Sequence, residues 1–421
     1  MIIYKLRIKL YDLNMFGSKK NPLVTDKNKI LEAFDRRKGD LGRRLENNGV
    51  FPSVEHVAEI LSKEARKIYL GIDPTGPDIH IGHTIPLLFL KQLCLYGHTP
   101  VIVIGGFTAR IGDPTGKDTT RKPLSSEQIK ENSKNYLEQV YKILPKDFVE
   151  ARNNADWLDK LTFKDIVNLA SHVTVQQFIQ RDMFQVRLSN GQPISLHEFL
   201  YPLMQGYDSV AMKIDGEVGG NDQTFNMLVG RDLEKKLLNK DKLVFVTQLL
   251  VDATTGKKMS KSEGDLISLS DTPSDMFGKI MSVPDGFIRG MFKLCTERDM
   301  DWIDKYDDDM KTKPYNYKKE LAFELVRMYH GEKEAQRAKD EWDKVFSKGE
   351  LPEQIEKAPG EGMKLVDFIT EHALAYSSSE AKRLLDQGAV SVNEEVVKEW
   401  NHILKKEDII RVGPRKFLKV S

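Results

Sequence analysis

Two histidines, His80 and His83, lie three residues apart just after the apolar run 67–72. Residues i and i+3 at the first turn of a helix share one face, to which free backbone N–H groups and the positive end of the helix dipole also point. Such a position suits a phosphate chain, and Gly82 would let a flat base or sugar approach the backbone closely. The alternatives are solvated histidines at a helix start, or a zinc pair, although zinc on a helix usually takes ligands at i and i+4 and a third ligand elsewhere.

A second candidate for phosphate chemistry is a loop framed by two lysines, Lys258-Met259-Ser260-Lys261-Ser262. Small and hydroxylated residues between lysines favour a mobile loop, which can place two ammonium groups on one anion and follow it through a reaction. A solvated basic loop is the alternative for this stretch taken alone. The histidine pair follows the first predicted α/β strand and the lysine loop follows the last, so together they form a two-part signature.

Three polar side chains, Tyr201, Gln205 and Asp208, stand at i, i+4 and i+7 on one face of the helix predicted over about 196–212. Their neighbours on that helix are mostly apolar: Leu200, Leu203, Met204, Tyr207, Val210 and Ala211. A solvent-exposed polar face would have polar neighbours, so we expect this stripe to line a pocket. The alternative is a buried structural hydrogen-bond network.

Glycine-rich segments supply two further candidates. Asp113 lies in a loop beyond the apolar strand predicted at 99–106, where it could pair with a substrate ammonium group. Gly219 and Gly220 would let the backbone reach a nucleoside, and the acidic Asp222 beside them could hold ribose hydroxyl groups. The alternative for this second segment is a plain tight turn.

The elements that must position these residues begin with a strand–helix–strand unit, in which a helical pattern from about 80 to 96 separates the two apolar strands. Near-continuous apolar strands joined through a helix are typical of a parallel sheet in an α/β domain. Further patterns predict helical stretches at 125–143 and 163–183, the helix at 196–212, a strand at 214–218, a helix from about Asp222 and a strand at 242–250. We therefore expect an α/β fold with a Rossmann-like parallel-sheet catalytic domain, followed by a helical domain and a small α+β module.

Shifts in composition predict the domain boundaries. A stretch rich in Gly, Pro and charged residues without periodicity reads as a linker before the last module. The expected divisions are a basic tail at 1–34, the catalytic domain at 35–270 with a helical insertion at about 120–200, a helical domain at 271–346, a linker at 347–362 and the small module at 363–421.

Composition excludes several classes of protein. Hydrophobic residues make up 40% and charged residues 30% of the 421 residues, which excludes a disordered, collagen-like or fibrous chain. No window approaches the roughly 18 uninterrupted apolar residues of a membrane span, and the N-terminus lacks the apolar stretch of a secretory signal. The two cysteines, Cys94 and Cys295, lie far apart in apolar contexts, so we expect a reducing cytoplasm and neither disulfides nor a Cys-rich zinc site. No carboxylate cage for a metal is visible.

Charge is spread unevenly along the chain. Residues 1–50 carry twelve Lys or Arg against six Asp or Glu, and residues 405–421 carry six against two, although the net charge of the whole chain is only +1. An acidic body with basic ends suits contact of the ends with a polyanion. Solvated basic tails are the alternative.

Taken together, the motifs resemble those of class I aminoacyl-tRNA synthetases, and more narrowly of bacterial-type tyrosyl-tRNA synthetases, over roughly residues 35–421. The resemblance rests on the segments 69–75, 105–117, 201–208 and 219–223 together with the histidine pair and the lysine loop. The last 59 residues resemble a small RNA-binding module that is also found in a ribosomal small-subunit protein. The family activates L-tyrosine with ATP, which brings Mg²⁺, and then transfers tyrosine to the 3′-terminal ribose of tRNA(Tyr), as a homodimer with a helical anticodon-arm domain.

The resemblance also implies roles for individual residues. The residues that it implies for stabilising charge on the phosphates are Thr75, His80, His83, Lys117, Arg121, Lys258 and Lys261. Contacts to tyrosine fall to Tyr69 and Asp208 at the phenolic hydroxyl, to Tyr201 and Gln205 at the amino-acid end, and to Asp113 and Gln223. Contacts to ATP fall to Gly71, Asp73, His80, Gly82, His83, Gly220, Asp222, Lys258, Met259, Ser260, Lys261 and Ser262. Contacts to tRNA fall to Lys382, Arg383, Arg411, Arg415 and Lys416.

One of the segments that carry the resemblance also looks like a different nucleotide-binding motif. Residues 112–117 look like a nucleotide P-loop, but Ile111 stands where that motif needs Gly, and Asp118 stands where it needs Ser or Thr. We therefore exclude a P-loop. Lys117 and Arg121 are instead candidates for a mobile loop over pyrophosphate, as the resemblance implies.

The sequence leaves other questions open. Glu217 stands where many relatives carry Gln, so its contact to the substrate is undefined. A tryptophanyl-tRNA synthetase fits less well, because Asp208 favours a hydroxylated ring, and an RNA-binding protein with an inactive site would not need every site residue. The tRNA identity elements, the role of residues 1–34, the start at Met1 or Met15, and the oligomeric state are not determined by the sequence.

Overall fold

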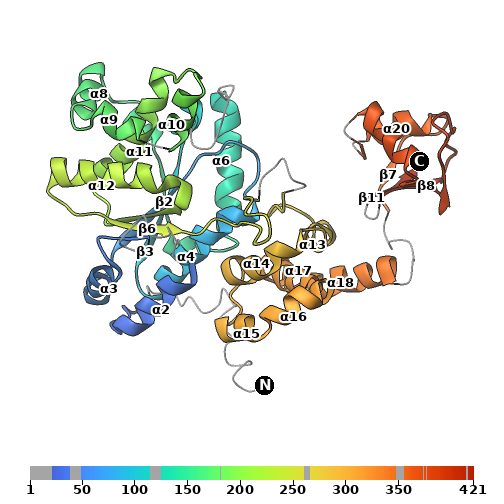
Figure 1. Cartoon of the computed structure of the whole chain (residues 1–421), viewed down its shortest axis with the longest axis horizontal. Helices are drawn as coiled ribbons and strands as arrows, with labels where there is room; N and C mark the ends of the chain where they lie inside the picture. The colour runs from blue at the N-terminus through green and yellow to red at the C-terminus, as the bar shows by residue number, and fades with distance from the viewer. Residues whose placement is uncertain are drawn as a thin grey trace. The chain divides into compact units, whose positions relative to one another are not determined.

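The computed structural model describes residues 21–37, 49–113, 125–180, 182–259, 266–347, 355–372, 374–375, 377–413 and 416–421. The chain forms two compact units that divide between Ala335 and Gln336, within helix α18 Glu332–Ser347. Figure 1 shows the elements of both units. The larger unit contains an α/β sheet domain and a helical part, and the smaller unit is mainly an α+β module. The expected fold class is therefore confirmed.

A six-stranded sheet organises the larger unit, with the strand order β1-β6-β5-β2-β3-β4. Its strands are β1 Val50–Phe51, β2 Lys67–Ile72, β3 Thr99–Ile104, β4 Glu150–Asn153, β5 Gly216–Gly220 and β6 Leu243–Thr247. Strands β2 to β6 pair in parallel, and β1 adds an antiparallel edge to β6. Residues 101–104 and 243–246 are buried without interruption. Apolar side chains therefore occupy both faces, as in parallel sheets that helices cover.

Helices connect these strands. Before β2 lies α3 Val54–Lys63, and between β2 and β3 lie η4 Ile81–His83 and α4 Thr84–Leu95. Between β3 and β4 lie α5 Thr108–Ile111, α6 Ser126–Val140 and η5 Lys146–Phe148, and between β5 and β6 lie η6 Asn221–Gln223 and α12 Thr224–Leu238. Helices α4, α6 and α12 match helical patterns of the sequence, whereas α3 and the short α5 were not predicted.

The expected helical insertion is a group of short helices around one long helix. It contains α7 Ala155–Leu158, α8 Phe163–Ala170, α9 Val175–Ile179, α10 Asp182–Ser189 and α11 Leu196–Met212. Thr162, Thr174 and Ser195 begin three of them as caps with reciprocal capping boxes, which explains why each helix starts where it does. The insertion range also includes β4, which the sequence analysis missed because its sequence, EARN, is too polar to stand out as a strand.

Helix α2, Lys27–Arg37, corrects the expectation of a basic tail reaching residue 34. Ile30 and Phe34 are fully buried. The Phe34 ring lies 6.0 Å from the ring of Phe89 and 5.7 Å from the ring of Phe245, so α2 packs on the sheet domain. The helix was missed because its short apolar stripe lies among charged residues.

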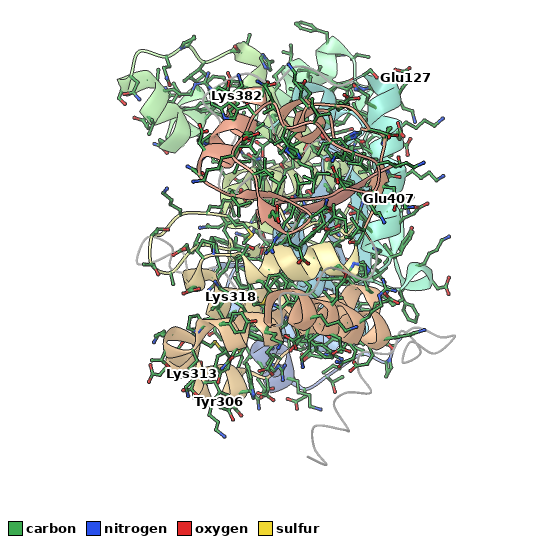
Figure 2. All side chains as sticks on the ribbon, turned by 90° about the vertical axis from the view of Figure 1, so that its right-hand side faces the viewer. Glu127, Tyr306, Lys313, Lys318, Lys382 and Glu407 are labelled. Carbon is green, nitrogen blue, oxygen red and sulfur yellow. The ribbon has the colours of Figure 1, made fainter. Side chains whose placement is uncertain are left out.

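The helical part follows the sheet domain. It contains α13 Pro273–Met281, η8 Asp285–Phe287, α14 Ile288–Cys295, α15 Met300–Lys305, α16 Asp307–Thr312 and α17 Pro314–His330, and it ends in the first residues of α18 Glu332–Ser347, which continues into the smaller unit. Tyr306, Lys313 and Lys318, labelled in Figure 2, belong to this part. Thr272 caps α13 and Pro273 occupies its first turn, where a proline is pre-organised for the helix and its missing N–H costs no hydrogen bond.

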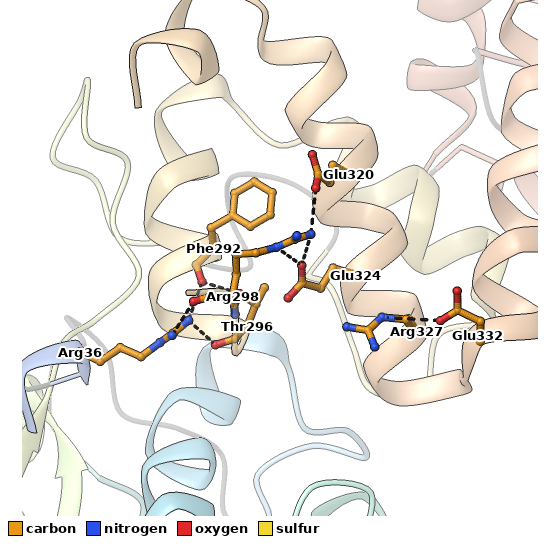
Figure 3. Close-up of polar contacts among 8 residues, drawn as sticks. All are labelled: Arg36, Phe292, Thr296, Arg298, Glu320, Glu324, Arg327 and Glu332. Carbon is orange, nitrogen blue, oxygen red and sulfur yellow. Dashed lines mark hydrogen bonds and ion pairs between the residues drawn. The ribbon is translucent and has the colours of Figure 1, made fainter. Parts of the chain in front are cut away.

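Two arginines of α2 fasten it to the helical part. Arg36 donates four hydrogen bonds of 2.6–3.2 Å to main-chain oxygens at and beyond the C-terminal end of α14, those of Phe292, Lys293, Thr296 and Arg298. Figure 3 shows the contacts of Arg36 with Phe292, Thr296 and Arg298. The neighbouring Arg37 donates to Leu294 and Thr296, and burial lowers the pKa of Arg37 to about 9. These donors satisfy carbonyls that a helix end leaves without intrahelical partners.

The smaller unit includes a second sheet, with the order β7-β11-β10-β8-β9. Its elements are β7 Lys357–Ala358, α19 Leu365–Glu371, α20 Ser378–Asp386, β8 Val390–Val392, β9 Glu395–Val396, β10 Ile409–Val412 and β11 Lys416–Val420. Phe368, Ile369, Leu385 and Ile410 are fully buried in its own core.

This sheet corrects the expected linker at 347–362. Strand β7 lies inside that range and pairs in parallel with β11, and Ala358 is buried in the module's core. Charged and Gly/Pro-rich composition hid this two-residue strand, because so short a strand has no periodicity of its own. No helix among the described residues of either unit is long and apolar enough to cross a membrane.

Candidate active site

The predicted site residues meet at one edge of the larger sheet. The chain places β3 on one side of β2 and β5 on the other, so the order of the strands reverses between β2 and β5. In open α/β sheets, ligands bind outside the carboxyl ends of the strands at such a point. Asp73 follows β2, Asn154 follows β4 and Asp222 follows β5 at this edge.

Asp73 joins three elements at this edge. Its carboxylate accepts hydrogen bonds from the hydroxyl of Thr108 at 2.6 Å and from the hydroxyl of Tyr201 at 2.9 Å. Gly105, directly after β3, makes room, because a Cβ there would lie 1.9 Å from Asp73 Oδ1. Burial, and then the charges of Asp73 and Asp113, raise the pKa of Tyr201 well above its ordinary value, so its hydroxyl stays a donor.

Asp208 is a buried carboxyl group on α11. It accepts a hydrogen bond of 2.7 Å from the indole Nε1 of Trp157 and one of 3.2 Å from Nδ2 of Asn154. Burial raises the pKa of Asp208 to about 8, although both donors act in the opposite direction. Neither Trp157 nor Asn154 was singled out in the sequence, and Asn154 follows the strand that was missed.

Tyr69 is the second buried hydroxyl group of this region. It lies on β2, and its oxygen is 3.2 Å from Oγ of Ser209, the residue after Asp208 on α11. Burial, followed by the charges of Glu217 and Asp208, raises the pKa of Tyr69 well above its ordinary value. The phenol of Tyr69 therefore stays protonated close to the Asp208 carboxyl.

A chain of side-chain amides links Gln205 to Asp113. Gln205 Nε2 donates to Glu217 Oε1 at 3.0 Å, and Asn226 Nδ2 donates at 3.0 Å to both Gln205 Oε1 and Gln223 Oε1. Gln223 Nε2 then donates to Asp113 Oδ2 at 2.6 Å. Asn226 of α12 is the middle of this chain, and the sequence analysis did not predict it.

The two histidines lie half-buried at the start of α4, with their rings stacked at 3.8 Å. His80 Nδ1 accepts from the Gly82 N–H at 3.1 Å, and His83 Nδ1 accepts from the His80 N–H at 3.4 Å. A neutral imidazole that accepts at Nδ1 carries its proton at Nε2. Each ring therefore carries its proton at Nε2. The N–H of Ile81 donates to the oxygen of Ile267, which fastens this segment to the chain beyond the lysine loop.

Lys258, the first lysine of the predicted loop, contacts Asp222, the residue predicted to bind the ribose of the nucleotide. Lys258 Nζ lies 2.8 Å from Asp222 Oδ2, and the Met259 N–H donates to Leu250 O at 3.0 Å. Thr75 lies in the turn after β2, where its N–H donates to Asp73 O at 2.8 Å. Other predicted residues of the site lie outside the described residues: Lys117, Arg121, Ser260, Lys261 and Ser262.

The comparisons with known proteins agree on the family. The family described as "tRNA synthetases class I (W and Y)" matches residues 61–347. The chain belongs to this family. Residues 363–410 of the synthetase match the S4 domain. It is 45% identical to a tyrosine–tRNA ligase of Carboxydothermus hydrogenoformans, over 90% of this chain and 98% of the relative. It is 42% identical to a tyrosine–tRNA ligase of Thermotoga maritima, over 86% of this chain and 93% of the relative.

Solved structures show the same fold at lower identity. A mitochondrial tyrosyl-tRNA synthetase of Coccidioides posadasii matches with a TM-score of 0.58 and 22% identity, over 74% of this chain and 91% of that chain. A tyrosyl-tRNA synthetase of Archaeoglobus fulgidus, complexed with L-tyrosine, matches with a TM-score of 0.58 and 21% identity, over 75% of this chain and all of that chain. The class I synthetase fold of the sequence analysis is thereby confirmed.

In this synthetase the sheet edge brings together the candidate residues of β2, α4, α11 and β5, with Asp113 joined through Gln223. Gly71 lies near the end of β2, Gly82 lies between the histidines, and Gly220 ends β5. The candidate RNA residues Lys382, Arg383 and Arg411 lie in the smaller unit, Arg415 lies outside the described residues, and the side chain of Lys416 is not described. Sequence reasoning missed Asn154, Trp157, Ser209, Asn226 and Lys242. Only their contacts across the fold identify them.

Proposed function

We propose that this synthetase is a tyrosine–tRNA ligase, as its curated relatives are named. The observation that carries the proposal is the pair of buried polar groups, the Asp208 carboxyl and the Tyr69 hydroxyl. A phenolic hydroxyl can donate to Asp208 and bond to Tyr69. A phenylalanine ring would leave both groups without that partner, and unmade buried hydrogen bonds disfavour binding. Tyrosine is therefore the amino acid that suits this pocket.

The other end of the amino acid would be held by the acceptors around Tyr201. Asp113 supplies a negative charge for the substrate ammonium group, and Gln205 and Gln223 supply amide oxygens beside it. Charge-assisted hydrogen bonds of this kind are roughly twice as strong as neutral ones. Tyr201 would be kept in place by its bond to Asp73.

Adenylate formation needs no covalent enzyme intermediate. The tyrosine carboxylate would attack the α-phosphate of ATP, with Mg²⁺ arriving as part of the nucleotide, and pyrophosphate would leave. The Nε2–H groups of His80 and His83 and the hydroxyl of Thr75 would stabilise the charge that develops on the phosphates. Lys258 would join them, with Lys117, Arg121 and Lys261 acting from segments outside the described residues.

The nucleoside would bind beside β5. Gly220 allows close approach, and Asp222 would accept from the ribose hydroxyl groups. Because Asp222 holds Lys258 in the structure, ATP binding would replace this ion pair and release the lysine towards the phosphates. Tyrosine would then pass from the adenylate to the 3′-terminal ribose of tRNA(Tyr).

The smaller unit would bind tRNA through a local basic face. Lys382, labelled in Figure 2, has its ammonium 4.8 Å from the ring of Trp400, and the exposed Arg383 lies beside it on α20. Arg411 packs over the Phe417 ring at 5.4 Å. Structured RNA is recognised largely through backbone and shape, for which a few well-placed cations suffice.

The insertion helices would form the interface of a homodimer. Phe163 and Leu196 are 81% and 80% exposed, and Val167, Val175 and Val186 are each more than half exposed. They belong to α8, α9, α10 and α11, which Figure 1 shows as one group. Apolar side chains gathered on one group of helices are typical of an interaction surface. A second copy of the chain is the occupant that we propose, and a cytoplasmic location, in which both buried cysteines stay reduced, is part of the same proposal.

Pyrophosphate exchange measured with each of the twenty amino acids tests the proposed function. Exchange that depends on tyrosine alone would support it. Exchange with tryptophan would assign the chain to the other branch of its family. No exchange with any amino acid, from a folded protein that still binds tRNA, would indicate an RNA-binding protein.

A further inference from the structure

A buried lysine stands behind the proposed tyrosine pocket. Lys242, just before β6, is completely buried, and its partner Glu217 on β5 is 2% exposed. The ammonium group pairs with Glu217 Oε2 and donates to Ser209 Oγ at 2.7 Å. Removing two charges from water costs several kcal/mol per ion, and apolar residues of similar volume are often as stabilising as a buried pair. The pair therefore calls for an explanation other than stability.

The fold reserves space for this ammonium group. A Cβ on Gly230 of α12 would lie 2.5 Å from Lys242 Nζ and 2.9 Å from Ser209 Oγ. Glu234 is a second buried carboxyl group near Lys242. Neither of its oxygens has a hydrogen-bond partner among the described residues. Burial raises the pKa of Glu234 to about 7. Glu217 is consequently the bonded partner of the lysine.

The pair fixes the direction of the amide chain. An ammonium group only donates and a carboxylate only accepts, so the nitrogen of Gln205 must face Glu217 and its oxygen must face Asn226. Asn226 then uses its nitrogen twice, which agrees with its Oδ1 having no partner among the described residues. The chain ends on a second carboxylate, Asp113. Carboxylates at both ends leave one orientation for all three amides.

The same lysine also reaches the phenol end of the pocket. Its bond to Ser209 Oγ occupies one lone pair of the hydroxyl that contacts Tyr69, and Nζ lies 5.7 Å from the centre of the Tyr69 ring. Lys242 thus connects Gln205, at the amino-acid end, with Tyr69, at the ring end, without belonging to either set of proposed tyrosine contacts.

We propose that Lys242 and Glu217 are positioning residues for tyrosine, which orient the Gln205 amide and the Tyr69 hydroxyl before the amino acid binds. This inference rests on the proposed tyrosine specificity and deepens it. It also gives a role to Glu217. A glutamine at position 217 has one oxygen. If Lys242 takes that oxygen, the amide nitrogen faces the nitrogen of Gln205, where two donors oppose each other.

The test is a double-mutant cycle in tyrosine-dependent pyrophosphate exchange. In Glu217→Gln, the new amide nitrogen and the nitrogen of Gln205 are two hydrogen-bond donors that face each other. In Lys242→Met, the buried carboxyl of Glu217 loses its cation and takes up a proton. Each variant should therefore raise the tyrosine KM about tenfold, which corresponds to the loss of roughly one hydrogen bond. The ATP KM and kcat should change by less than about twofold, because phosphate contacts are untouched. The double variant Glu217→Gln/Lys242→Met should have a lower tyrosine KM than Glu217→Gln, because the glutamine oxygen is then available to Gln205. Its KM should stay above that of the wild type, because the bond from Lys242 to Ser209 Oγ is still absent.

Controls and contrary outcomes are defined by the same assay. Lys240→Met removes a lysine that pairs with Asp215 at 2.8 Å outside the chain of amides, and it should leave the tyrosine KM unchanged. Folded single variants with a wild-type tyrosine KM, equal rises in the KM for tyrosine and ATP, or a folded double variant whose tyrosine KM is no lower than that of Glu217→Gln would each overturn the proposal. If Lys242→Met does not fold, Glu217→Gln and the double variant decide it by the same criteria. A wild-type enzyme without tyrosine-dependent exchange would overturn the proposed function as well, whereas normal wild-type exchange with unaffected variants would overturn the positioning role alone.

Discussion

Asp208 is the residue of the proposed tyrosine pocket whose carboxylate form is made unfavourable by burial. Burial raises its pKa to about 8 even with Trp157 and Asn154 donating to it. A carboxyl group whose folded pKa lies above its unfolded value binds the proton more tightly in the folded state. Its contribution therefore lowers the stability of the ligand-free protein progressively as the pH rises from about 4 to about 8.

Asp208→Asn should remove this pH dependence. The variant loses one hydrogen bond at every pH, but its free energy of unfolding relative to the wild type should increase from pH 5 to pH 8, by on the order of 3–4 kcal/mol. Tyrosine binding should weaken at the same time, because the acceptor of the phenol proton is lost. Urea unfolding at several pH values and fluorescence titration with tyrosine measure the two effects. A stability difference that does not vary with pH would contradict the assignment.

His80→Ala should slow adenylate formation while leaving tyrosine affinity nearly intact. The ring carries its proton at Nε2 and lies at the start of α4, away from the amide chain that would hold the amino acid. Loss of a hydrogen bond that strengthens in the transition state costs roughly 2–4 kcal/mol of barrier. Single-turnover kinetics give the rate constant directly. An unchanged rate constant with weaker tyrosine binding would place His80 in the amino-acid pocket instead.

At the scale of single elements, helix α2 supports the segment that carries the two histidines of the candidate site. Helix α2 packs Phe34 against the sheet domain and directs Arg36 and Arg37 at the C-terminal end of α14. The same helix end contacts the histidine segment, because Cys295 Sγ lies 3.9 Å from the main-chain oxygen of Ile81. A short helix near the N-terminus thus braces the element that faces the nucleotide.

Arg36→Met should therefore destabilise the larger unit. The substitution leaves helix-end carbonyls without donors, and hydrogen bonds to charged groups are worth about 1.5–3 kcal/mol each, so a loss of roughly 2–4 kcal/mol is expected after partial replacement by water. Arg231→Met is the matched control, since Arg231 pairs with the more exposed Asp241 on the surface at 2.8 Å. Surface pairs contribute about 0–1 kcal/mol. Equal urea midpoints for the two variants would show that α2 is not a brace.

At the scale of the whole molecule, chemistry and tRNA binding would be divided between the two units. The sheet and its candidate site lie in the larger unit, whereas the S4 match lies in the smaller one. Each unit has a hydrophobic core of its own, and units of this kind fold and act separately. Because β7 belongs to the smaller sheet, a clean truncation must end before Lys357.

A chain ending at Ser347, the last residue of α18, should keep tyrosine-dependent pyrophosphate exchange within about twofold of the full chain, since no proposed contact to tyrosine or ATP is lost. Its binding to tRNA should weaken and become less dependent on salt, because fewer cations would contact phosphates. Filter binding at several salt concentrations checks this. Full charging efficiency, or loss of exchange from a folded truncated chain, would contradict the division.

The proposed homodimer gives a prediction at the same scale. Phe163→Asp places a charge among the exposed apolar side chains of α8 to α11, which should shift the protein from a dimer to a monomer. Val396→Asp, at a 60% exposed position in the smaller unit, is the control. Light scattering measures the mass. A wild-type monomer, or a dimer that tolerates Phe163→Asp, would exclude this surface as the interface.

Local spacing in the sequence determined the features that depend on one element at a time. The i, i+3 histidines and the i, i+4, i+7 stripe of α11 follow from helical periodicity, and the apolar runs of β2, β3 and β6 follow from burial in a parallel sheet. The family resemblance rests on these local motifs. The short, polar or charge-rich elements α2, β4 and β7 carry too weak a period to be predicted.

Tertiary structure alone decided which polar groups are paired. Tyr201 and Asp73 are 128 residues apart in the chain, and Lys242 lies 33 residues from Ser209 and 25 from Glu217. Nothing in the local pattern around Lys242 distinguishes it from a solvated lysine. The packing of α11 and α12 over the sheet removes water from it, and a buried charge must then be paired by whichever side chains the fold brings within reach.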